Sequence, residues 1–172
     1  MILPFSTQLN GKPTYFVEKI LRGILNEHSH KGLGLAECIY QSGEALKYQN
    51  VDDIFTLIEN KVKPKLHTIR EDKNDRWKAG TKIDFFINCR QPTMFRFAPV
   101  LPVVSIQKIS VEYDLFFGKH LGPQVLVDNK KLSPDKLKLL AQNDGFDTVE
   151  DFFNYFSTDF DGKLIHWTDL KY

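Results

Sequence analysis

The sequence predicts an α+β fold with a mostly antiparallel sheet or a small barrel. Apolar residues recur at helical spacing in the first third of the chain, which predicts helices there. After Gly80 the period changes to two, which predicts strands, and two further helices and a last strand follow. For 172 residues we expect a single domain over 1–172, with a helical insert at about 26–60.

The N-terminal part begins with a short apolar strand, "ILPF", and a turn, "NGKP". Pro13 then stands at a plausible first position of a helix. The apolar residues of this helix are Phe16, Val17, Ile20, Leu21, Ile24 and Leu25. A weaker helical pattern covers 35–47, and residues 51–62 predict a short helix.

Strands are predicted from "TKIDFFINC", "TMFRFAPV" and "VVSIQKISVEYD". The alternation in the last of these is imperfect, which predicts a bend or bulge near Lys108. "PQVLVD" and "NKKL" predict a hairpin around Asp128 and Asn129.

Two helices are predicted near the C-terminal end. Ser133 and Pro134 give a cap and a first helical position for one of them. In the other, Asp147 is the expected N-cap, with Glu150 three residues later as in a capping box. Its stripe of Val149, Phe152, Phe153 and Phe156 predicts a buried face, and "GKLIHWTDL" predicts a final strand.

The composition is that of an ordinary globular protein, with 42% hydrophobic and 26% charged residues. A net charge of +1 argues against a large surface that coats nucleic acid. Cys38 and Cys89 belong to no disulfide or metal motif, and neither an export signal nor a stretch of ~20 apolar residues occurs. We therefore expect a cytoplasmic location, no membrane partner, no metal and no cofactor; the oligomeric state stays open.

One segment, "KPKLHTIREDKNDRWKAGTKI" at 63–83, carries a cluster of polar and basic side chains. Pro64 excludes a regular helix, so we expect an irregular backbone that brings Lys65, Thr68 and Arg70 together. A desolvated lysine can act as a base, and an arginine can bind a carbonyl or phosphate through two parallel hydrogen bonds. Surface charges that precede a strand are the alternative explanation.

This segment resembles the motif of ASCH domains in the PUA-like superfamily. That motif is Gly-x-Lys-x-x-Glu-x-Arg, followed by an aromatic residue and a glycine turn into a strand. Lys65 and Arg70 match its Lys and Arg, while Trp77 and Gly80 supply the aromatic residue and the turn. A lysine replaces the Gly, and Thr68 replaces the Glu. The resemblance covers about 61–167 and implies a PUA-like small β-barrel flanked by helices.

"KLHTIR" is also similar to the Lys-x-x-Thr-x-Arg pattern of a bacterial branch, the YqfB-type amidohydrolases that cleave N4-acylcytidines. This resemblance implies that Lys65 is a base and that the Thr68 hydroxyl attacks or positions water. It also implies a Glu from a later helix, for which Asp144 is the counterpart here and would hold Lys65. Arg70 would orient the substrate or stabilise the oxyanion.

The leading functional hypothesis is binding of RNA or a modified nucleotide. Lys65 and Arg70 would hold phosphate, His67 would belong to the ligand site, and Trp77 or a strand phenylalanine would stack a base. The alternative is an amidohydrolase acting on an acylated nucleoside such as N4-acylcytidine. A second alternative, a protein-interaction domain, rests on the helical block of 26–60.

Overall fold

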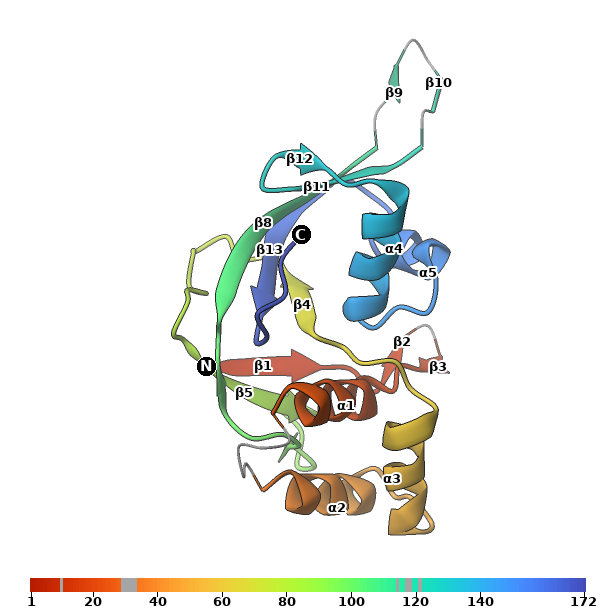
Figure 1. The fold of residues 1–172 in the computed structure, drawn as a ribbon, viewed down its shortest axis with the longest axis vertical. Helices are drawn as coiled ribbons and strands as arrows, with labels where there is room; N and C mark the ends of the chain where they lie inside the picture. Colours follow the sequence, from red (N-terminus) through yellow and green to blue (C-terminus); the bar gives the residue numbers. More distant parts are fainter. Residues whose placement is uncertain (10, 29–33, 114, 117–118, 121) are drawn as a thin grey trace. The chain divides into compact units, whose positions relative to one another are not determined.

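A computed structural model describes residues 1–9, 11–28, 34–113, 115–116, 119–120 and 122–172 (Figure 1). The chain divides into two compact units. Unit 1 contains Met1–Leu66 and Thr81–Pro102, and unit 2 contains His67–Gly80 and Val103–Tyr172. Helices and several sheets occur together, so the α+β prediction is confirmed.

The main sheet of unit 1 is built around one central strand, β5 (Lys82–Ile87). β1 (Ile2–Phe5) pairs with it in parallel, whereas β6 (Phe95–Arg96) and β7 (Leu101–Pro102) pair with it antiparallel. Two parallel strands need a long connection, and the chain between β1 and β5 contains three helices. A short ribbon of β2 (Gln8–Leu9) and β3 (Lys12–Pro13) precedes them.

Each of the three helices of unit 1 buries apolar residues. They are α1 (Phe16–His28), α2 (Leu35–Ala45) and α3 (Val51–Asn60). Ile20, Ile24 and Ile54 are fully buried. The predicted insert of 26–60 therefore holds the end of α1, α2 and α3, with 29–33 outside the described residues.

Pro13 is not the first residue of α1, as the sequence suggested, but lies in β3. The helix begins at Phe16, whose N–H donates to the Thr14 hydroxyl at 3.3 Å. A threonine side chain can accept a bond from the first helical amides, so it sets the start of the helix in place of the proline.

Unit 2 contains one five-stranded sheet in the order β12-β11-β8-β13-β4. All neighbours in it are antiparallel. The strands are β4 (His67–Arg70), β8 (Ser105–Glu112), β11 (Gln124–Val127), β12 (Lys130–Lys131) and β13 (Phe160–His166). β4 and β12 form its two edges, so this sheet is open and no closed barrel is seen among the described strands. A separate ribbon joins β9 (Leu115–Phe116) to β10 (Lys119–His120).

The predicted hairpin is confirmed, because Asp128 and Asn129 lie between β11 and β12 with φ of 49° and 63°. Two consecutive positive φ angles are those of a type I′ turn. The predicted bulge near Lys108 is wrong. β13 pairs with β8 from Phe160 to His166 without interruption, and Lys163 is the partner of Lys108.

One face of the unit 2 sheet is covered by α4 (Pro134–Asn143) and α5 (Val149–Tyr155) (Figure 1). The Ser133 hydroxyl accepts from Lys136 N at 3.4 Å, which confirms the predicted cap of α4. The cap of α5 is Thr148 rather than Asp147, because its hydroxyl accepts from Asp151 N at 3.0 Å. Phe152 and Phe156 are buried in the core, as predicted.

Among the described residues, no helix combines the length and the hydropathy that crossing a bilayer requires.

Candidate functional site

The predicted site residues fall into both units. Lys65 belongs to unit 1, whereas His67, Thr68, Arg70, Trp77 and Asp144 belong to unit 2.

Lys65 lies on an irregular segment, as the sequence predicts. This segment runs beside α1. Only 1% of its surface is exposed. Its backbone N–H donates to the Lys19 carbonyl at 2.8 Å, and its Nζ lies 5.0 Å from the centroid of the Phe16 ring. Gly23 makes this approach to α1 possible, since a Cβ there would stand 2.6 Å from the Lys65 carbonyl oxygen.

His67, Thr68 and Arg70 lie on a regular strand, β4, and not on the irregular segment that we expected. Successive side chains of a strand point to opposite faces, so Thr68 and Arg70 share one face and His67 the other. Thr68 is 2% exposed and His67 is fully buried. The strand forms because "HTIR" pairs residue by residue with Lys163–His166 of β13.

Asp144 ends α4 and binds the outer edge of β4. Its Oδ1 accepts from the Ile69 N–H at 3.2 Å and lies 3.6 Å from Nδ1 of His67. Burial lowers the pKa of Arg70, and the negative charge of Asp144 opposes that shift. The buried Asp144 carboxylate therefore joins α4 to the edge strand β4.

His67 also belongs to a buried polar cluster that sequence reasoning missed. Its Nε2 lies 2.8 Å from the Tyr172 hydroxyl, and Asn143 donates to the same hydroxyl at 2.9 Å. The Gln107 amide pairs with the Tyr172 backbone, accepting from its N–H at 3.1 Å and donating to its oxygen at 3.2 Å. Nothing in the local pattern around Tyr172 distinguishes it from a surface residue.

His166 completes this cluster beside His67, with 5.2 Å between the two ring centroids. It is fully buried, and neither ring nitrogen has a hydrogen-bond partner among the residues that the structure describes. Burial lowers the pKa of His166 to about 4, and the positive charge of Lys171 contributes to the shift. The imidazole is therefore neutral at pH 7.

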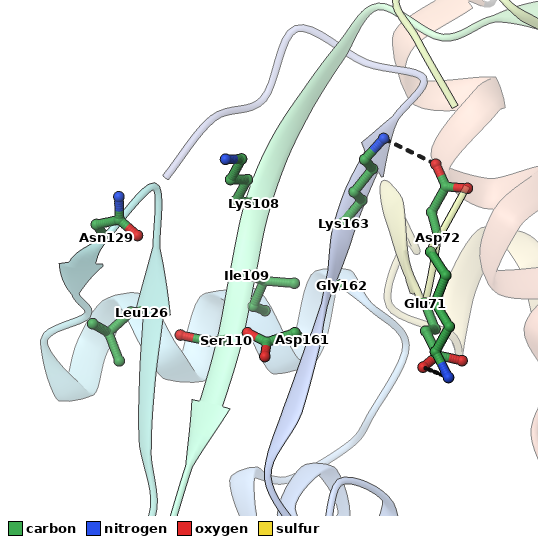
Figure 2. A pocket seen from close by; sticks show the side chains of 11 residues that line it. Glu71, Asp72, Lys108, Ile109, Ser110, Leu126, Asn129, Asp161, Gly162 and Lys163 are labelled. Carbon is green, nitrogen blue, oxygen red and sulfur yellow. Dashed lines mark hydrogen bonds and ion pairs between the residues drawn. The ribbon is translucent and has the colours of Figure 1, made fainter. Parts of the chain in front are cut away.

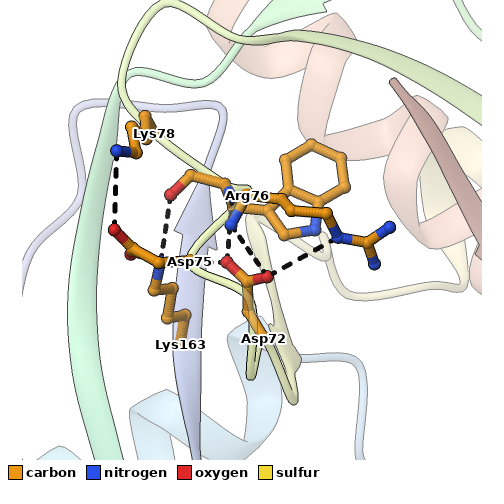
Figure 3. A network of polar contacts seen from close by, with 6 residues as sticks. Asp72, Asp75, Arg76, Lys78 and Lys163 are labelled. Carbon is orange, nitrogen blue, oxygen red and sulfur yellow. Dashed lines mark hydrogen bonds and ion pairs between the residues drawn. The ribbon is translucent and has the colours of Figure 1, made fainter.

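Trp77 is buried, with 5% of its surface exposed, so its ring presents no stacking platform to a base in this structure. Asp72 fixes the loop around it, accepting from Trp77 N at 2.9 Å and Arg76 N at 3.0 Å (Figure 3). Burial by itself raises the pKa of Asp72, but these bonds and the Lys163 ammonium bring it down to about 2.

Lys163, on β13, holds the same loop from the sheet (Figure 3). Its ammonium lies 2.9 Å from Asp72 Oδ2 and 3.2 Å from the Trp77 carbonyl, and it also bonds to Asp75. The hydrogen bonds to the two carboxylates raise the pKa of Lys163 against the opposing effect of burial. Asp72, Asp75, Trp77 and Lys163 thus form a structural clamp that fixes this loop to β13.

A groove of about 510 Å³ lies in unit 2, on the β4 loop and on strands β8, β11 and β13 (Figure 2). Its lining includes Lys73, Lys108, Lys163, Asn129 and Asp161. Lys73 is 3.0 Å from Glu71, and Lys163 is engaged by the clamp. Lys108 is exposed and forms no ion pair with any described residue.

The groove was not foreseen from the sequence. The side chains that line it alternate along β8 with core residues, whereas the sequence pattern around Lys108 predicts a bend or bulge. Gln107, Ile109 and Val111 point to the helix-covered face, and Lys108 and Ser110 point to the other.

Within the described part of the chain, no group of three or more His, Cys, Asp or Glu side chains is placed to hold a metal ion.

In comparisons with known proteins, no family model, no curated protein and no solved structure matches this chain.

Proposed function

We propose that the protein binds RNA or a modified nucleotide, with a phosphate at the groove of unit 2. The observation that carries this proposal is the exposed Lys108 ammonium beside the groove, which has no ion-pair partner among the described residues (Figure 2). An anion can bind it without first displacing a carboxylate, unlike Lys73 and Lys163. The Asn129 amide lines the same groove and can donate a further hydrogen bond.

Two features of the sequence support the same function. The segment 63–83 resembles the ASCH motif. On this resemblance we also propose that the chain belongs to the PUA-like superfamily. The net charge of +1 fits a ligand with few phosphates better than a long duplex.

Binding is tested by fluorescence anisotropy with a short single-stranded RNA and by calorimetry with a nucleoside monophosphate. Lys108→Met keeps most of the side-chain bulk and removes the charge, so it should weaken binding about tenfold if the contact is worth ~1.4 kcal/mol. Lys138→Met, on the exposed surface of α4 and outside the groove lining, is the matched control and should have no effect.

The salt dependence gives a second measure. With Lys108 as the main phosphate contact, the log–log slope for single-stranded RNA should have a magnitude of about 0.7–1.4, for one or two phosphates at ~0.7 each. A slope above about 5 would instead show an extended basic surface. Equal affinity of Lys108→Met and the unchanged chain would show that the phosphate does not bind at the groove.

The second candidate function is hydrolysis of an acylated nucleoside such as N4-acylcytidine. Its support is the burial of Lys65 and Thr68, which are 1% and 2% exposed. Lysine is rarely buried so fully, and loss of hydration favours the neutral amine, which can accept a proton. The sequence resemblance alone assigns these roles, with Lys65 as the base, Thr68 as the hydroxyl and Asp144 as the carboxylate.

Hydrolysis of N4-acetylcytidine, followed by chromatography, tests this candidate. Thr68→Val removes the hydroxyl at nearly constant shape, so an enzyme loses turnover and a binding module keeps its affinity. Lys65→Met should also abolish turnover, and a melting curve checks that the buried methionine is tolerated. Unchanged hydrolysis in both variants would contradict these catalytic roles.

A further inference from the structure

A small hollow of about 160 Å³ lies in unit 1, at the N-terminal end of α1. Its lining residues include three aromatic residues, Tyr15, Phe16 and Tyr48, together with Glu18. Pockets that take a drug-sized molecule hold about 300–1,000 Å³. The hollow therefore suits a single small group, such as the end of a side chain or the head of a small molecule.

Glu18 is unusual because its carboxyl-bearing side chain is buried. It is 4% exposed and accepts a hydrogen bond from the Tyr48 hydroxyl at 2.6 Å. It forms no ion pair with any residue in the part of unit 1 that the structure describes. Buried carboxylates are usually paired with a cation, and the N-terminus of α1 supplies only about half an elementary charge.

Tyr48 keeps its proton and so remains a donor to Glu18. Burial raises the pKa of Tyr48 most, and the hydrogen bond to Glu18 and the charge of Asp53 add to the rise. The phenol therefore leaves the negative charge of Glu18 in the hollow, where a positively charged group would be stabilised.

The aromatic rings favour a cation of low hydration. A cation within about 6 Å of an aromatic ring centroid is attracted by the face of the ring. The Phe16 ring is already occupied on one side, since Lys65 Nζ lies 5.0 Å from its centroid. Tyr15 is 43% exposed, and its φ of 53° is one that few residues other than glycine adopt. Strained backbone conformations of this kind cluster at functional sites. The φ of Tyr15 therefore supports a function for this exposed residue in the lining of the hollow.

We propose that this hollow binds an alkylated ammonium group, with Glu18 as its counter-charge and Tyr15 and Tyr48 as its aromatic walls. Two sources carry this chemistry, a free small ammonium compound and an N-methylated lysine side chain of another protein. This site is separate from the groove of unit 2, and its test does not depend on RNA or nucleotide binding.

Calorimetry of the full chain with choline and with 3,3-dimethyl-1-butanol tests the proposal. The two compounds have nearly the same shape, but the alcohol replaces the charged nitrogen by carbon. We expect saturable binding of choline and at least about tenfold weaker binding of the alcohol, because only choline interacts with Glu18 and the ring faces. Equal binding of both compounds would overturn the proposal, as would no saturable binding of choline at about 10 mM.

Variants connect the binding to these residues. Glu18→Gln keeps an acceptor for Tyr48 and removes the charge, so choline should bind about tenfold more weakly. Tyr15→Leu removes an exposed ring without altering the core and should weaken binding about threefold to tenfold. Tyr40→Leu, 46% exposed on α2 and outside the hollow lining, is the control and should bind as the unchanged chain does. Unchanged affinity in Tyr15→Leu would also overturn the proposal.

A peptide that carries trimethyllysine separates the two sources. Tighter binding of this peptide than of choline, lost in the unmethylated peptide, identifies a protein side chain as the occupant. Equal binding of the methylated peptide and choline identifies the free ammonium compound, because the peptide backbone then adds nothing.

Discussion

The Asp144 carboxylate accepts a hydrogen bond from the Ile69 backbone N–H at 3.2 Å. This bond connects the C-terminal end of α4 to the outer edge of β4, where no further strand is paired within unit 2. Backbone N–H groups at the outer edge of a sheet have no strand to bind. The Asp144 side chain supplies the acceptor for one of them, the Ile69 N–H.

Asp144→Ala should destabilise the protein by about 1–3 kcal/mol, because it leaves the buried Ile69 N–H without its acceptor. Asp144→Asn keeps an acceptor oxygen and should lose less. Chemical denaturation measures both free energies of unfolding. Lys138→Ala on the exposed side of α4 is the control and should stay within about 0.5 kcal/mol. Equal losses for Asp144→Ala and the control would show that the bond contributes nothing to stability.

The second prediction concerns the phenylalanine stripe of α5. Phe152 is fully buried, whereas Phe153 is only partly buried against the same core. Phe152→Ala should therefore cost about 3–5 kcal/mol, and Phe153→Ala clearly less. Thermal or denaturant unfolding compares the two variants under one condition. A larger loss for Phe153→Ala would contradict the packing of α5 against the sheet.

The elements that follow from local sequence were predicted well. The stripe of α5, the cap at Ser133 and the turn at Asp128 and Asn129 depend on residues a few positions apart. The start of α5 was placed one residue too early because Asp147 and Thr148 are both good caps, and only the tertiary structure selects between them.

Features that depend on distant residues were not predictable in the same way. The parallel pairing of β1 with β5 joins residues some eighty positions apart, and its direction leaves no local pattern. "HTIR" became a strand because Lys163–His166 pairs with it, although Pro64 had suggested an irregular segment. Lys65, Thr68 and Arg70 were recognised as unusual from their residue types, but the partners Tyr172 and Asn143 of His67 lie too far along the chain to be inferred.

The third prediction is a pH dependence of stability that His166 causes. Its folded pKa of about 4 lies below the ordinary value of 6.5, so the unfolded chain binds a proton first on acidification. The stabilisation is therefore complete above pH 6.5 and is lost as the pH falls through the folded pKa near 4. At ~1.4 kcal/mol per pKa unit, the loss is on the order of 3 kcal/mol.

His166→Phe should remove this part of the pH dependence. The free energy of unfolding is measured at several values between pH 7 and pH 4 for both proteins. The difference between them isolates His166 from other groups that titrate in the range. Parallel curves for the two proteins would show that the His166 imidazole has the same pKa in the folded and unfolded chain.

The last prediction concerns the clamp between Lys163 and Asp72. Their side chains are 14% and 1% exposed, so water screens the pair weakly. Lys163→Met leaves the Asp72 carboxylate buried without its ammonium, and a break of this kind costs about 3–5 kcal/mol at a fully buried pair. We expect a smaller loss than this, because Asp72 keeps the N–H groups of Arg76 and Trp77.

A double-mutant cycle with Asp72→Asn separates the pair from the loop. The asparagine can still accept a hydrogen bond from one of the two backbone amides. The cycle therefore measures mainly the interaction between the Asp72 charge and Lys163. We expect a coupling energy of about 0.5–3 kcal/mol between the two positions. Hydrogen exchange of the Arg76 and Trp77 amides should become faster in Lys163→Met, because the loop loses its connection to β13. Additive effects of the two substitutions, with unchanged exchange, would show that the sheet does not hold the loop through this lysine.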